Sequence, residues 1–129
     1  MKTILLSMAL SLSLLCDTTI RWYGDFDEAL KASQSSRKPL FVVAVERGCS
    51  ECRELFATTL MRKSVVAIVN SKTVPVIVTK ESENYPIELL YTLSYPAIFL
   101  LSPDEVLLKG PITGAVEAAL LEKELFNEL

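Results

Sequence analysis

The segment LFVVAVERGCSECR, residues 40–53, guides the interpretation of the whole chain. Residues 40–45 are all apolar, and a run without polar alternation predicts a central strand covered on both faces by helices. The polar residues 46–48 then form a turn, and Cys49 and Cys52 follow where a helix is expected to begin. The segment therefore predicts a strand, a short loop and a helix that starts at a Cys-x-x-Cys motif.

The composition limits the functions that the chain can have. Its 129 residues suit a single domain, and half of them are apolar, as in a folded globular protein. A net charge of −3 argues against a nucleic-acid binder, which would show a basic face. The absence of histidine excludes a Ser-His-Asp triad, a Cys-His pair and a histidine metal site. Any chemistry must come from Cys, Asp, Glu, Lys, Tyr, Ser or Thr.

The N-terminus has the features of an export signal. Lys2 precedes an uncharged, leucine-rich stretch over residues 3–16. A membrane-spanning helix needs about 20 apolar residues, so this shorter run behind a basic start predicts a signal peptide over residues 1–16. One domain over residues 17–129 then remains. An uncleaved N-terminal anchor or lipid attachment to Cys16 is the alternative, and either would tether the chain to a membrane.

Three further strands are expected beyond the cysteines. The first covers residues 74–78, where Pro75 requires a sheet edge or a position without a hydrogen-bond partner for the missing N–H. The second covers residues 97–101, directly after Tyr95-Pro96, and the third covers residues 106–108 and pairs with the second as a hairpin.

Four helices are expected besides the one that begins at the cysteines. Asp25 can cap the first of them, and Glu28 is placed to complete a capping box. Gly110 and Pro111 are expected to interrupt the chain before the last helix. The other three helices are predicted at residues 64–70, at residues 87–91 behind Pro86, and at residues 115–127.

Cys49 and Cys52 carry the strongest chemical signal in the sequence. At the start of a helix, free backbone N–H groups and the helix dipole favour the nucleophilic thiolate of Cys49. One turn later, Cys52 is placed to attack a mixed disulfide and release the product. The motif therefore indicates a redox-active pair in which Cys49 attacks and Cys52 resolves.

The motif has two other interpretations. A zinc site needs four ligands, and two mature cysteines without histidine do not supply them, so no metal is expected. An inert structural disulfide is the stronger alternative, although a bridge between Cys49 and Cys52 closes a short loop and restricts the unfolded chain little.

The motif and its surroundings resemble the thioredoxin superfamily. Residues 49–52 follow an apolar strand, and Tyr95-Pro96 precedes a later one. Residues 22–32 and 38–40 resemble, more narrowly, small exported bacterial thioredoxin-like proteins. The C-terminal domain of the membrane electron transporter that reduces periplasmic proteins is similar. The resemblance covers about residues 20–127.

This resemblance implies an α/β thioredoxin fold, in which helices flank a four-stranded mixed sheet. It also implies that Pro96 is cis and lies beside the cysteines, and that the backbone of Tyr95 receives an extended substrate segment. The implied location is the periplasm, and no cofactor is expected. The implied partners are protein disulfides or dithiols and an electron donor or acceptor.

The chain departs from the family at two positions. Gly48 stands where many members have tryptophan, and Val43 stands where many have a buried acid that assists proton transfer. Glu46 and Glu51 are nearby carboxylates that could take over this transfer. Without histidine in the motif the thiolate is less stabilised, which favours a reductant or mid-potential exchanger over a strong oxidant. A thioredoxin-like binding module with an inert disulfide is the alternative.

Overall fold

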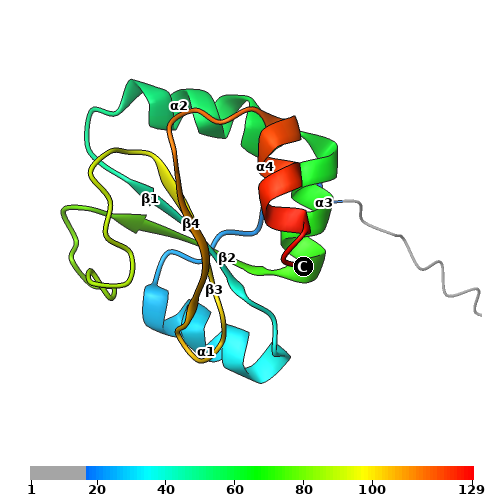
Figure 1. Ribbon diagram of the computed structural model, residues 1–129, viewed down its shortest axis with the longest axis vertical. Coiled ribbons are helices and arrows are strands. Elements are labelled where there is room, and N and C mark those ends of the chain that lie inside the picture. Colours follow the sequence, from blue (N-terminus) through cyan, green and yellow to red (C-terminus); the bar gives the residue numbers. More distant parts are fainter. Residues whose placement is uncertain (1–16) are drawn as a thin grey trace, which may run out of the picture.

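The computed structural model describes residues 17–129, and the predicted signal peptide, residues 1–16, lies outside the described residues. A four-stranded sheet with the order β2-β1-β3-β4 forms the centre (Figure 1). Strand β1 is parallel to β2 and antiparallel to β3, and β3 is antiparallel to β4. The elements are α1 (Phe26–Ser36), β1 (Leu40–Val45), α2 (Ser50–Ala57), the 3-10 turn η1 (Thr59–Met61), α3 (Lys63–Lys72), β2 (Val74–Thr79), β3 (Ala97–Leu101), β4 (Leu107–Thr113) and α4 (Ala118–Phe126).

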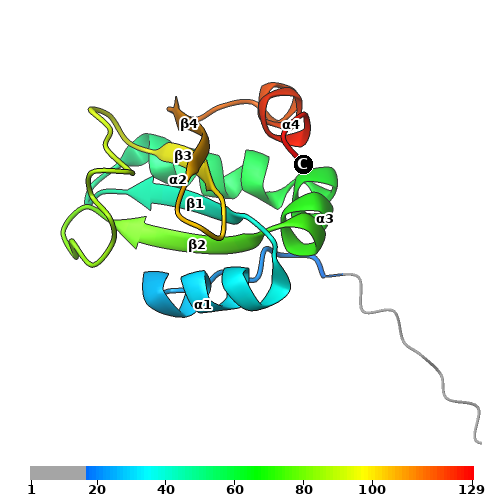
Figure 2. The ribbon, with the colours of Figure 1, turned by 60° about the horizontal axis from the view of Figure 1, so that its bottom comes forward.

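Helices cover both faces of the sheet, as the unbroken apolar run predicts. Figure 2 shows α1 on one side and α2, α3 and α4 on the other. Successive side chains of a strand point to opposite faces, so Phe41 and Val43 pack with α2, α3 and α4. Leu40, Val42 and Ala44 pack on the side of α1. Within residues 17–129, no helix has the length and apolar character needed to cross a membrane.

The start of α1 and the position of Pro75 confirm two local predictions. The Asp25 side chain caps α1 by accepting the backbone N–H of Glu28 at 2.9 Å. Strand β2 lies at a sheet edge, where the carbonyl of Pro75 accepts the N–H of Tyr23. The N and C=O of one strand residue point the same way, so the missing donor of Pro75 faces away from β1.

Strand β4 is longer than predicted. The predicted strand ends at residue 108, because Gly110 and Pro111 are expected to interrupt the chain. In the structure both residues lie inside the strand, with a cis peptide bond between them. The pairing of β4 with β3 is irregular here, and an edge strand tolerates a proline because its outer side needs no donor.

Two predicted helices also differ from the structure. Of the predicted residues 87–91, residues 87–90 form a hydrogen-bonded turn in which Leu89 and Leu90 donate to one shared carbonyl oxygen. A single turn gives too few hydrogen bonds to sustain a helix, and buried Leu90 ties this turn to the sheet instead. Helix α4 begins at Ala118 rather than at residue 115, because Glu117 is still extended.

Candidate functional site

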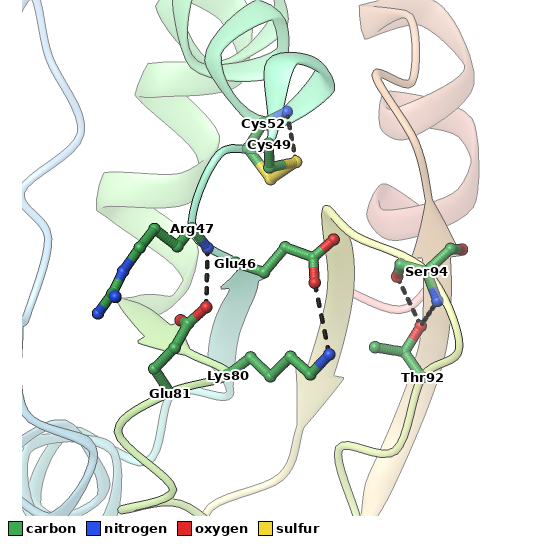
Figure 3. Close-up of a disulfide and its surroundings, with 8 residues drawn as sticks. All are labelled: Glu46, Arg47, Cys49, Cys52, Lys80, Glu81, Thr92 and Ser94. Atoms are coloured by element: carbon green, nitrogen blue, oxygen red, sulfur yellow. Dashed lines mark hydrogen bonds and ion pairs between the residues drawn. A yellow bond between two sulfur atoms is a disulfide. The ribbon is translucent and has the colours of Figure 1, made fainter.

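Cys49 and Cys52 form a disulfide at the N-terminus of α2 (Figure 3). Their Cα atoms lie 5.2 Å apart. Cys49 is the N-cap residue, and the backbone N–H of Cys52 donates to its Sγ at 3.1 Å. The predicted helix start at the cysteines is therefore confirmed. A first-turn N–H directed at the Cys49 sulfur stabilises negative charge there once the disulfide opens.

The two cysteines differ in exposure. Cys52 is only 6% exposed and belongs to the core, whereas Cys49 is half-buried. A sulfur of another protein can attack only where the disulfide is accessible. Cys49 is therefore the more accessible of the two, and its role as the attacking thiol stays a prediction.

Glu46, at the end of β1, contacts a cation that the sequence analysis did not identify. Its Oε2 lies 3.6 Å from Nζ of Lys80, and Figure 3 shows the Glu46 side chain pointing toward this lysine. Nζ of Lys80 also lies 5.7 Å from the centre of the Tyr95 ring. Lys80, directly after β2, thus contacts both Glu46, directly after β1, and Tyr95, the residue before Pro96.

Glu81 is a second residue that the sequence analysis missed. Its Oε1 accepts the backbone N–H of Arg47 at 2.9 Å. This hydrogen bond is the main cause that holds the pKa of Glu81 below its ordinary value, and the charges of Arg47 and Lys80 lower that pKa further. The carboxylate of Glu81 thereby ties the loop after β2 to the turn that leads to Cys49.

A signal for both missed residues exists in the sequence. Parallel strands end at the same edge of a sheet, and Val45 lies opposite Thr79 in the register of β1 and β2. The charges that follow these strands, Glu46-Arg47 and Lys80-Glu81, are opposite in sign and order. Predicting the parallel pairing of the two strands would have brought these charges together.

Glu51 lies apart from this charged group. Its Oε2 is 3.6 Å from the point where a Cβ on Gly114 would stand, so the carboxylate borders the segment after β4. The N–H of Gly114 in turn donates to the carbonyl of Pro96 at 2.9 Å. Within residues 17–129, Glu51 takes part in no ion pair. Glu46 thus contacts Lys80, whereas Glu51 borders Gly114.

The Tyr95–Pro96 peptide bond is cis, as the resemblance implies. Pro96 is buried and Tyr95 is half-buried. Burial raises the pKa of the nearby Tyr85 hydroxyl, and the Tyr95 side chain raises it further, so these two aromatic residues lie together. A substrate-binding role for Tyr95 and Pro96 stays a prediction.

No carboxylate lies in the core at the position where many family members have one. Val43 is fully buried in an apolar cluster with Phe41 and Leu55. A proton released by a cysteine thiol must therefore be taken up by water or by a surface carboxylate. Within residues 17–129, no group of three or more His, Cys, Asp or Glu side chains could hold a metal ion.

The mixed sheet, the helices on both faces, the disulfide at the start of α2 and the cis-proline before β3 define the class of thioredoxin-fold proteins. The thioredoxin-like family pattern matches residues 21–103, and the chain belongs to this family. A comparison with curated protein sequences gave no match.

Several solved structures share the fold. A thioredoxin from Thermus thermophilus is 20% identical, with a TM-score of 0.71, over 84% of this chain and 86% of that chain. A DsbH oxidoreductase is 18% identical, with a TM-score of 0.66, over 85% of each chain. The reduced DsbD C-terminal domain from Neisseria meningitidis is 18% identical, with a TM-score of 0.66, over 80% of this chain and 93% of that chain. At these identities the likeness establishes the fold.

Proposed function

We propose that the chain is an exported thiol–disulfide oxidoreductase that exchanges disulfides with protein substrates. The observation that carries the proposal is the geometry of Cys49, which is half-buried at the N-cap of α2 and accepts a first-turn N–H at its sulfur. The likeness to a DsbH oxidoreductase and to a thioredoxin supports the same chemistry. The predicted signal peptide over residues 1–16 supports a periplasmic location.

The exchange proceeds in two steps. In the reduced protein, the Cys49 thiolate attacks one sulfur of the partner's disulfide, and the other partner sulfur leaves as a thiolate. Cys52 then gives up its proton and attacks the Cys49 sulfur, which forms the intramolecular disulfide and frees the second partner thiolate. The partner gains two electrons, the cysteine pair loses two, and a dithiol electron donor must reduce the pair again.

Surface carboxylates are the proposed proton acceptors for Cys52, because the core beneath the motif is apolar at Val43. Glu46 is the stronger candidate, since Lys80 keeps its carboxylate at the end of β1. Glu51 borders Gly114 and is the second candidate. Tyr95 and Pro96 are proposed to present backbone groups to an extended substrate segment.

Trapping a mixed disulfide tests the proposal directly. A Cys52→Ser variant lacks the resolving thiol, so it should accumulate mixed disulfides with exported proteins, seen as higher-mass bands that a reductant removes. Cys49→Ser is the matched control and should trap nothing, because the accessible sulfur is gone. A folded Cys52→Ser variant that captures no partner would contradict the proposal.

The direction of exchange is proposed to be reducing or mid-potential. Equilibration in glutathione and dithiothreitol buffers should give a potential nearer about −270 mV than about −120 mV. A value near about −120 mV would identify a disulfide donor instead.

A thioredoxin-like binding module with an inert disulfide is the second candidate function. Buried Val43 favours it, because this core offers no acid to take the proton of the resolving thiol. A disulfide that stays oxidised below about −300 mV would support this module. Partner binding that survives removal of both thiols would do the same.

A further inference from the structure

The segment between β2 and β3, residues 80–96, projects from the end of the sheet where the disulfide lies (Figures 1 and 2). Glu81, near its start, accepts the N–H of Arg47, two residues before Cys49. Pro96, at its end, leads directly into β3. Both ends of the segment are therefore held close to the candidate site.

The middle of this segment is anchored on the sheet. Leu90 is 2% exposed and packs into the cluster on the α1 side, where Tyr85 and Leu89 are partly buried. A second set of apolar residues, named here the apolar rim, points to solvent: Ile87 is 45% exposed, Tyr91 64% and Leu93 88%. Exposed apolar side chains that gather in one place are typical of interaction surfaces, and these three lie within seven residues of one anchored segment.

The same segment carries an excess of negative charge. Residues 80–96 contain three glutamates and a single base, Lys80, which pairs with Glu46 outside the segment. Arg47 offsets the charge of Glu81, to which its backbone donates. Glu83 and Glu88 are exposed and form no ion pair within the described part of the chain. The apolar rim is therefore bordered by negative charge that remains available to a partner.

We propose that residues 81–93 form a docking surface for partner proteins whose reactive disulfide is flanked by apolar and basic side chains. The proposal rests on the proposed thiol–disulfide exchange and names its substrate class. The apolar rim would bury the partner's apolar groups, while Glu83 and Glu88 would attract its lysines or arginines. A partner held in this way presents its disulfide to the Cys49 thiolate, and the two exchange steps are unchanged.

Two synthetic peptides test this selection. Each carries one internal disulfide with a leucine beside it, and the two differ only in having lysines or glutamates at the same flanking positions. The reduced protein is mixed with each peptide, and peptide thiols are measured over time. The lysine peptide should be reduced about tenfold faster at low salt, with a smaller preference in about 0.5 M salt. Uncharged hydroxyethyl disulfide serves as the reference for exchange without docking.

Variants distinguish the contribution of the charge to the exchange rate from that of the apolar rim. Glu83→Lys combined with Glu88→Lys should remove or reverse the preference for the lysine peptide. Leu93→Ser should slow both peptides about three- to fivefold and leave hydroxyethyl disulfide unaffected. Val106→Ser is the matched control, since Val106 is 57% exposed but lies in the turn after β3, at the opposite end of the sheet. It should change none of the rates.

Two results would overturn the docking surface while leaving the exchange intact. In the first, the wild-type protein reduces both peptides at the same rate. In the second, Leu93→Ser and Val106→Ser reduce the peptides at identical rates. In both cases the reduction of hydroxyethyl disulfide is normal. A wild-type protein that fails to reduce hydroxyethyl disulfide would instead contradict the oxidoreductase function, and the docking proposal would fall with it.

Discussion

Strand β1 and the seven residues that follow it, 46–52, differ sharply although they are adjacent in the chain. Five of the six β1 residues are buried, and the strand carries no charge. Four of the next seven residues are exposed, and this segment, the turn and the start of α2, holds two acids, one base and both cysteines of the motif. The contrast predicts that the fold depends mainly on β1 and the redox chemistry mainly on residues 46–52, with the disulfide as the feature that contributes to both.

A cavity in β1 should give the largest effect on stability. Phe41 is fully buried, and its ring lies 6.0 Å from that of Trp22. Phe41→Ala should lower the free energy of unfolding by about 3–5 kcal/mol in denaturant titrations, because it removes apolar contacts and leaves a void. The redox potential of the folded fraction should stay unchanged. A potential that shifts together with stability would show that the strand and the turn are coupled.

Opening the disulfide should have a smaller effect on stability and also reports the direction of exchange. The bridge between Cys49 and Cys52 closes a loop of only a few residues, so the oxidised protein should be about 2 kcal/mol more stable than the reduced one. Stability and potential form one thermodynamic cycle, and a more stable oxidised form corresponds to a reductant. A more stable reduced form, in matched denaturant titrations, would identify an oxidant.

Neutralising Glu46 should affect the rate of exchange much more than stability. Its ion pair with Lys80 is partly exposed, so Glu46→Gln should cost less than about 1 kcal/mol. If this carboxylate accepts the Cys52 proton, release of the mixed disulfide should slow by about tenfold or more near neutral pH.

The chain provides a matched control for this substitution. Glu124 pairs with Lys109 at 2.8 Å, between α4 and β4. Glu124→Gln removes a similar ion pair away from the cysteines and should leave the exchange rate unchanged. Equal slowing by both substitutions would rule out a specific role for Glu46.

Local signals explain which parts of the fold were predictable. The apolar run of β1 and the Asp25 cap are encoded within a few residues, and both were predicted correctly. Strand β4 was shortened because Gly110 and Pro111 interrupt its pattern and its outer residues are exposed, so no alternation marks the edge strand. Its extent follows from pairing with β3, which single-sequence patterns do not show.

The residues of the candidate site likewise differ in whether a local pattern predicts them. Cys49 and Cys52 identify themselves through their spacing, and Pro96 through the family resemblance. Lys80 and Glu81 reach the site only because β1 and β2 pair in parallel, which brings residues far apart in the sequence to one edge. Long-range pairing of this kind has no local pattern.

The smallest expected effect concerns Glu81 and depends on pH. The hydrogen bond from the Arg47 N–H is the largest cause that lowers the pKa of Glu81 from its ordinary value of 4.5. A lowered native pKa stabilises the fold above the unfolded pKa, and this contribution is lost as pH falls through the native pKa. The small stability advantage of wild type over Glu81→Gln should therefore be constant above about pH 5.5 and shrink below about pH 4.5. Thermal unfolding measured across this range checks the sign, and an advantage that grows toward acid would contradict the hydrogen bond between Glu81 and the turn before Cys49.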